Sequence, residues 1–299
     1  MKKKLLLVVL LGCLILPAAA IEKFSKDYSK LYNYVLNEDK RPEISQELRD
    51  NMINLYFYQR QRNEWANAAK TNNYVCELTE KLYGADDYET LAQRIDRIDN
   101  NYYLGLYKQA LDESEELYKT TKEKKYTDIA NNALLYTANI YMMTEQPLKA
   151  IEYYNKIPDK NNFNSWQKAD LYINKSKMYL LLAEPEKALA TVKQYYKSIK
   201  EPNDIDKYRY YQALSEIYSW QGNYNLAMDY IAKAETFVNK VDENNKRLLI
   251  GIDFFKGNLY NSTDNSEAAK EILKEVKYYL DKDINNGETE NLYRHSMYY

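Results

Sequence analysis

The chain has few of the residues that build metal centres and catalytic sites. Its 299 residues include two cysteines and one histidine, His295. A zinc site needs about four ligands drawn mainly from cysteine and histidine, and a Ser-His-Asp arrangement needs a histidine held against the nucleophile. No spacing singles out a pair of carboxylates for acid and base work either. We therefore predict no catalytic residue, no metal site and no cofactor, and we do not expect an enzyme.

Turn-forming residues are also scarce, with seven glycines and six prolines. Folds rich in β-strands need frequent turn residues, so this composition points away from them. Gly84, Gly105 and Gly222 stand alone, which excludes a glycine-rich phosphate-binding loop. The 33 tyrosines argue against disorder, because disordered chains contain few aromatic residues. Helices are the remaining expectation.

The chain has no excess of basic residues. Without Lys2, Lys3 and Lys4, 39 of the 42 basic residues remain against 44 acidic ones, a net charge of −5. Proteins that bind nucleic acid concentrate positive charge on one surface, because they must displace counterions from phosphates. The balance therefore excludes nucleic acid as the expected partner, and it disfavours direct adsorption to anionic lipid.

The first twenty residues predict export. Lys2, Lys3 and Lys4 precede an apolar run from Leu5 to Pro17, and three alanines follow at 18–20. A positive segment, a short apolar segment and a small-residue cleavage site make up a secretory signal peptide. The run from Leu5 to Ala20 is 16 residues, shorter than the ~20 of a spanning helix. We predict a signal peptide over 1–20 and a periplasmic or cell-envelope location.

Cys13 provides an alternative to simple cleavage. The segment Leu10-Leu11-Gly12-Cys13 resembles the lipobox of bacterial lipoproteins. Acyl chains on Cys13 would hold the protein on a membrane surface, and this is the one route to a membrane that we expect. Leu14 and the residues after it continue the apolar run, which favours ordinary cleavage. Cys76 would then be the single cysteine left, so no intramolecular disulfide is expected.

A pattern of small, aromatic and apolar residues repeats four times. It reads small residue, two residues, Tyr, eight residues, Ala, three residues, apolar, two residues, apolar. The four copies are Ala138-Tyr141-Ala150-Tyr154-Ile157, Ser176-Tyr179-Ala188-Val192-Tyr195, Ser215-Tyr218-Ala227-Ile231-Ala234 and Gly257-Tyr260-Ala269-Leu273-Val276. Self-similarity at a fixed period of this length is typical of repeat architectures.

Each position of the pattern has a physical reason. The small residue and the Tyr lie three apart, on one face of a first helix. The Ala and the two apolar residues form the stripe of a second helix. Small side chains at facing positions let the two backbones approach closely. Pro147 and Pro185 fit the first turn of a second helix, where a missing N–H costs nothing.

These small, Tyr, Ala and apolar positions resemble the tetratricopeptide repeat (TPR) family. The resemblance implies an all-α fold, a right-handed α-solenoid of about five to six antiparallel helix pairs, in which the first helices line the concave side. It covers 128–280 well and extends upstream through Ala110 and Ala68. The alanines are then spaced 42, 40, 38, 39 and 42 residues apart, more than the family's usual ~34.

The signal-peptide features and the resemblance together predict a division of the chain into four parts. Residues 1–20 are the signal peptide, 21–84 a capping helix near 23–36 with a degenerate repeat, 85–282 the TPR-like repeats and 283–299 a C-terminal tail. The first two units are degenerate because Gln59 and Asn101 stand where the other units have Tyr.

The residue after each small residue defines a polar row along the first helices. We expect this row and its neighbours to line the concave groove, where they offer side-chain polar groups beside apolar and aromatic ones. Such a surface suits a peptide held by polar contacts and apolar anchors. The predicted groove residues are Asp99, Tyr102, Asn139, Met142, Lys177, Glu216, Trp220 and Asn258.

Two functions remain open. The resemblance implies an exported protein-interaction scaffold that binds a peptide or protein partner in the groove. The alternative is a protein of the bacterial envelope that binds glycan or peptidoglycan, because sugar rings stack on aromatic faces. The ordinary explanation of the polar row, a helix face turned to water, has about equal weight with a binding role.

Overall fold

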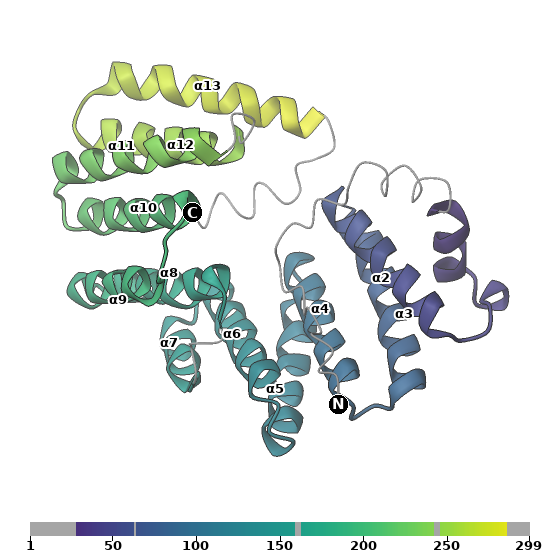
Figure 1. Cartoon of the computed structure of the whole chain (residues 1–299). Coiled ribbons are helices and arrows are strands. Elements are labelled where there is room, and N and C mark those ends of the chain that lie inside the picture. Colours follow the sequence, from purple (N-terminus) through teal and green to yellow (C-terminus); the bar gives the residue numbers. More distant parts are fainter. Residues whose placement is uncertain (1–27, 63, 159–162, 242–245, 286–299) are drawn as a thin grey trace. The chain divides into compact units, whose positions relative to one another are not determined.

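The structure is a computed structural model that describes residues 28–62, 64–158, 163–241 and 246–285. Within these ranges every regular element is helical and none is a strand (Figure 1), which confirms the predicted all-α class. Residues 28–36 are helical, so the predicted helix near 23–36 is described in part. The predicted signal peptide and residues 286–299 lie outside the described ranges. The labelled elements are η1 Glu38–Lys40, α2 Gln46–Gln61, α3 Trp65–Tyr83, α4 Tyr88–Tyr103, α5 Tyr107–Glu123, α6 Thr127–Met143, α7 Pro147–Lys156, α8 Ser165–Leu181, α9 Pro185–Ser198, α10 Asp204–Trp220, α11 Tyr224–Val241, α12 Lys246–Ser262 and α13 Ser266–Asn285.

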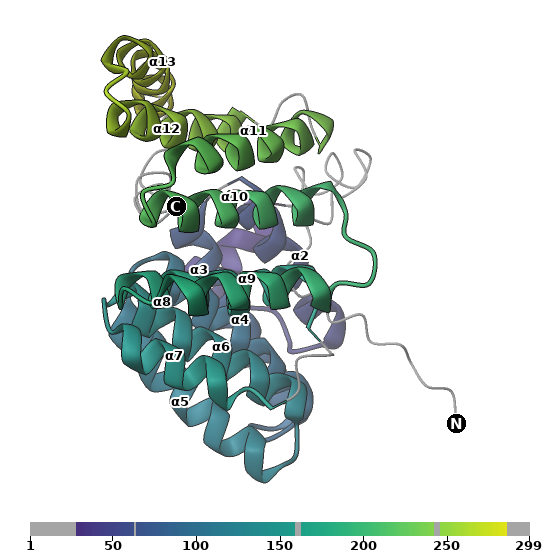
Figure 2. The same cartoon turned by 90° about the vertical axis from the view of Figure 1, so that its left-hand side faces the viewer.

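The chain divides into two compact units, residues 1–133 and 134–299, with the division inside α6. In unit 1, α3 packs against both α2 and α4, and α4 packs against α5. In unit 2, each helix from α7 to α13 packs against the next one along the chain. Figure 2 shows α10 and then α11 as layers above α8 and α9 in this unit. Such contacts between sequence neighbours are the packing of a helical solenoid.

Each predicted alanine is the fourth residue of a second helix, and each is buried. Five of them have no exposed surface and the sixth is 4% exposed. The alanine N–H bonds to the carbonyl of the residue four positions earlier, which is the last residue before its helix starts. The alanine is therefore where the first turn of the second helix closes, and a larger side chain there would hold the helices apart. These residues are Ala68, Ala110, Ala150, Ala188, Ala227 and Ala269.

The turn before each second helix has the same backbone form wherever it is described. The residue five positions before the alanine has a positive φ of 56–74°, although only two of the five are glycine. Left-handed backbone costs about 1 kcal/mol or more for other residues, so the compact turn is maintained against that strain. The five are Gly105, Glu145, Ala183, Gly222 and Asp264.

The small residue of the first helix is buried against the second helix. Ser215 donates a hydrogen bond from its hydroxyl to the carbonyl oxygen of Ala227, at 2.6 Å. At Gly257 a Cβ atom would lie 2.6 Å from Leu273 Cδ2, so the glycine is needed for the approach of α12 to α13. In unit 1 the same position holds Tyr56 and Ile98, both fully buried. The first two helix pairs thus keep the buried alanine of the second helix but have a large residue in place of the small residue of the first helix.

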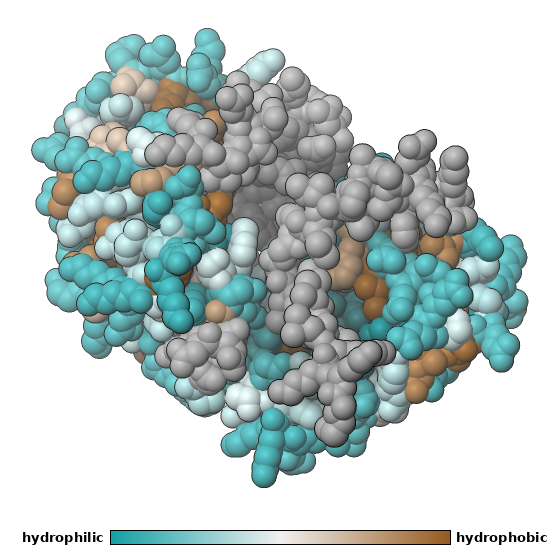
Figure 3. All heavy atoms as spheres, in the orientation of Figure 1, coloured by the Kyte–Doolittle hydropathy of each residue, from teal (hydrophilic) through white to brown (hydrophobic). Residues whose placement is uncertain are grey.

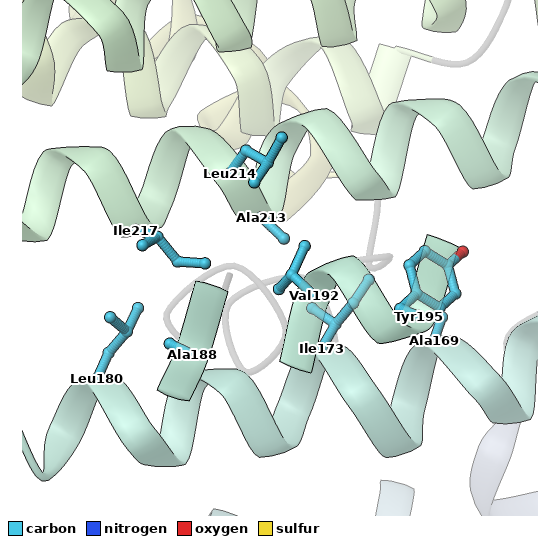
Figure 4. Packing of buried hydrophobic residues seen from close by; sticks show 9 residues of the cluster. All are labelled: Ala169, Ile173, Leu180, Ala188, Val192, Tyr195, Ala213, Leu214 and Ile217. Atoms are coloured by element: carbon cyan, nitrogen blue, oxygen red, sulfur yellow. The ribbon is translucent and has the colours of Figure 1, made fainter. Parts of the chain in front are cut away.

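The core of unit 2 is shared between consecutive pairs. One buried cluster takes residues from three helices, α8, α9 and α10, and Figure 4 shows how its residues are arranged. Because each pair covers the apolar face of its neighbour, stability depends on the stack rather than on one pair. The cluster is Ala169, Ile173, Leu180, Ala188, Val192, Tyr195, Ala213, Leu214 and Ile217.

We predict that Ala227→Glu lowers the free energy of unfolding by several kcal/mol, because it places an unpaired carboxylate in a filled contact. Ala232→Glu, on the exposed face of the same helix α11, is the matched control and should change stability by less than about 0.5 kcal/mol. Urea unfolding followed by circular dichroism measures both. Equal stability of the two variants would mean that the assigned helix contact is wrong.

Candidate functional site

The predicted polar row lies on the first helices, and most of it is bonded to neighbouring helices. In unit 1, Asp99 of α4 forms an ion pair with Arg60 of α2. In unit 2, Asn139 accepts hydrogen bonds from Tyr154 at 2.6 Å and from Asn174 at 3.3 Å. Asp99 and Asn139 are only 3% and 5% exposed. These two residues therefore link helices and offer little surface to a ligand.

The other predicted residues differ in how far they reach solvent. Tyr102 and Met142 are partly buried, and Tyr102 packs edge-on against Tyr103 and Tyr107. Asn258 is exposed, and Trp220 is 58% exposed at the end of α10. In the view of Figure 3 the surface is mainly hydrophilic, with apolar residues in small separate patches. Trp166 is likewise 52% exposed, so two of the three tryptophans of the chain are more than half exposed.

Lys177 and Glu216 lie together in a pocket between α8 and α10, within unit 2. Its volume is about 40 Å³, enough for part of a side chain rather than a whole ligand. The core residues Ala169, Ile173 and Ala213 contribute apolar lining, and Figure 4 shows their packing. The polar and aromatic lining residues are Trp166, Asp170, Asn174, Lys177, Arg209, Gln212 and Glu216.

Arg209 is held in the pocket wall by aromatic groups. Its guanidinium carbon lies 3.5 Å from the ring centre of Trp166. The hydroxyl of Tyr195 lies near Arg209 and donates a hydrogen bond to Asp206 at 3.2 Å. Burial, together with the nearby Asp206, raises the pKa of Tyr195, so this hydroxyl stays protonated. Nη1 of Arg209 is buried and has no hydrogen-bond partner among the described residues.

Glu216 occupies the other end of the pocket and has only long contacts. Its carboxylate lies 4.0 Å from Lys177 Nζ and 3.5 Å from Gln212 Nε2. Burial raises the pKa of this carboxyl, and Lys177 opposes the rise. Hydrogen bonds to carboxylates are normally shorter than 3 Å. The acid is therefore desolvated without being well bonded.

Sequence reasoning found Lys177 and Glu216 and missed Trp166, Asp170 and Arg209. A readable signal was present, since Asp170 and Arg209 each stand seven residues before a predicted residue of the same helix. Seven residues are close to two helical turns, so they share a face. Trp166 lies eleven residues before Lys177, three turns away on that face.

Unit 1 contains a second charged cluster, which is enclosed by aromatic rings. Arg60 bonds to Tyr56 and Asp99 and lies over the rings of Trp65 and Tyr103. Asp96 accepts a hydrogen bond from Gln93 Nε2 at 2.9 Å. Burial raises the pKa of Asp96 to about 7, with Arg60 opposing the rise and Asp99 adding to it.

Neither a metal site nor a reactive thiol is evident in the described residues. Cys76 is buried on α3, as expected for a small apolar residue, and burial raises its pKa to about 12. No group of three His, Cys, Asp or Glu side chains in the described ranges could hold a metal ion. His295 lies outside those ranges. The described helices also include none with the length and apolarity to cross a membrane.

The comparisons identify the fold. No family model matches the chain, and no curated protein matches it significantly. Among solved structures it resembles a tetratricopeptide repeat protein from Parabacteroides merdae, at 14% identity over 92% of this chain and 97% of that one, with a TM-score of 0.59. The apo form of RapI is 16% identical over 93% and 81%, with a TM-score of 0.61. PilW, a type IV pilus biogenesis factor, is 13% identical over 83% and 98%, with a TM-score of 0.53. The fold is thus the TPR α-solenoid, as the repeat pattern predicted.

Asp96 predicts a pH dependence of unit 1. Its carboxyl has a higher pKa in the folded chain than the ~3.9 of an unfolded one, so folding takes up a proton between these values. The contribution of Asp96 to stability is then fully present below about pH 4 and is lost as the pH rises through 7. We expect this contribution to fall by about 2–3 kcal/mol between pH 5 and pH 8.

Urea unfolding at the two pH values measures this loss. Asp96→Asn should remove most of it, whereas Asp86→Asn, at an exposed acid, should leave it unchanged. A pH dependence that survives Asp96→Asn would contradict the assignment.

Proposed function

We propose that this chain is an exported interaction scaffold that binds a peptide segment of a protein partner on the first helices of unit 2. The pocket between α8 and α10 is the centre of the binding surface. The observation that carries the proposal is Arg209, which places a buried N–H without a partner beside the 52% exposed Trp166.

Energetics support this assignment. A buried donor without an acceptor costs about 1–3 kcal/mol, and a ligand acceptor recovers that cost. Arginine and tryptophan are also the residues that most often dominate binding energy at interfaces. The guanidinium is already stacked on the ring of Trp166, so little side-chain entropy is lost when a partner binds. Because its side chains are already held in place, this site is better suited to binding a partner than to packing the protein interior.

Trp220 extends the proposed surface along α10. It is 58% exposed, and Leu181, at the equivalent end of α8, is 56% exposed. Two apolar side chains at equivalent ends of neighbouring first helices provide anchor points beyond the polar pocket. A segment that contacts Trp220 and the pocket would lie along α10, and one that contacts both Leu181 and Trp220 would cross from α8 to α10.

Export remains part of the proposal. It rests on the signal-peptide features of residues 1–20, with Cys13 as the alternative site of lipid attachment. Intact-mass measurement of the mature protein should give a chain that starts at Ile21. An acylated chain that starts at Cys13 would replace the soluble form by a membrane-anchored one.

We predict that Trp166→Ala reduces partner capture at least fivefold and that Trp220→Ala reduces it by a smaller factor. Wild-type protein is coupled to beads and exposed to envelope extract, and the captured proteins are quantified by mass spectrometry. Tyr278→Ala is the matched control, because Tyr278 is a 63% exposed aromatic residue on the second helix α13. Capture that is unchanged in Trp166→Ala would move the site elsewhere. Wild-type protein that captures no protein and sediments with purified cell-wall polymer would favour the glycan alternative.

A further inference from the structure

We propose that the α8–α10 pocket recognises an internal peptide segment with an acidic and a basic side chain three residues apart, and an apolar residue next to the acidic one. This inference rests on the proposed function, because it assigns the chemistry of the partner at the same site. The charge pattern follows from the two ends of the pocket, because one end has an unpaired hydrogen-bond donor and the other has a poorly bonded carboxylate.

One end of the pocket needs an acceptor. Nη1 of Arg209 is buried and has no partner among the described residues, while the guanidinium is stacked on the ring of Trp166. A carboxylate forms the shortest and strongest bonds with such a group. The partner residue at this end is therefore Asp or Glu.

The other end needs a donor. The Glu216 carboxylate is desolvated, and its contacts to Gln212 and Lys177 are 3.5 and 4.0 Å long. A basic side chain from the partner can approach within normal hydrogen-bond distance of this acid. An anionic side chain would meet the charge of Glu216 at close range, which disfavours a partner that is acidic throughout.

The helix sets the spacing between the two ends. Arg209 and Glu216 are seven residues apart on α10, which separates them by about 10 Å along the helix axis. A peptide in the polyproline II conformation has three residues per turn and advances about 3.1 Å per residue, so side chains three residues apart lie on one face and span about that distance. Adjacent charges on the partner cannot reach both ends together.

Trp166 sets the apolar neighbour. The residue is 52% exposed, and the guanidinium of Arg209 is stacked against its ring. The exposed part of the ring can pack against an aliphatic or aromatic side chain next to the partner's acidic residue. Since the pocket holds about 40 Å³, that side chain would lie over the ring rather than enter the pocket.

Labelled peptides with blocked ends test the spacing by fluorescence anisotropy with the wild-type protein. The probe is acetyl-Gly-Glu-Leu-Ala-Lys-Gly-amide, and three controls have the Glu changed to Gln, the Lys changed to Gln, or Glu and Lys placed side by side. We expect the probe to bind about tenfold more tightly than each control, as for a close charge pair. Binding of all four peptides with the same affinity, or of none of them, would overturn the inference.

Variants of the protein locate the contacts. Arg209→Gln should abolish the difference between the probe and the Glu-to-Gln peptide, and Glu216→Gln the difference between the probe and the Lys-to-Gln peptide. Lys193→Gln, at an exposed lysine of α9, should preserve both differences. Glu216→Lys should prefer a peptide in which the Lys is replaced by Glu. Loss of preference without this reversal would contradict the assignment of Glu216.

The two proposals fail separately. The peptide series uses changes in the ligand, which cannot unfold the protein, whereas capture from extract is judged by Trp166→Ala. Capture that depends on Trp166, combined with peptides that show no charge preference, would refute the charge pattern and leave the binding function intact. Charge-selective peptide binding without capture of any protein would support the charge pattern and refute capture of a protein partner from the envelope.

Discussion

The structure depends on the contact between two helices of a pair at a buried alanine. A methyl group is small enough for the second helix to approach the first closely, and the same residue closes the first turn of its helix. Because the contact recurs in every pair of the described chain, the pairs have a common geometry. The first helices then present equivalent faces, and the positions seven residues apart on those faces can be compared from pair to pair.

The alanine contact also explains which parts of the fold were readable from sequence. The position of the alanine, the size of its side chain and the face of the helix on which it lies all depend on nearby residues in the sequence. The pattern therefore predicted the second helices correctly, including Pro147 and Pro185 as first residues of α7 and α9. It also located the alanines of the two degenerate pairs. It did not show that Tyr56 and Ile98 replace the small residue there, because that substitution requires compensation across the helix contact.

Only some residues of the candidate site were predicted from the sequence, because the site depends on contacts between helices as well as on the pattern within each helix. Helix phase alone identifies Lys177 and Glu216, but the phase says nothing about how closely neighbouring first helices approach. Asp99 and Asn139 occupy the same position in their helices and are buried, because partners on adjacent helices lie within hydrogen-bond distance. Trp166 stands at the second position of α8, two residues after Asn164, whose capping box with Gln167 starts the helix. The start of the helix had to be recognised before Trp166 could be added to the face.

Accessibility of the alanine positions tests the central claim most directly. Cysteine is placed singly at Ala188 and Ala227, and at the exposed Ala190 and Ala232 of the same helices as controls. Reaction with a maleimide is followed under native conditions. The structure predicts that the cysteines at 188 and 227 react only as fast as the protein unfolds, while those at 190 and 232 react at once. Equal rapid reaction at all four positions would show that these helices do not meet at the alanines.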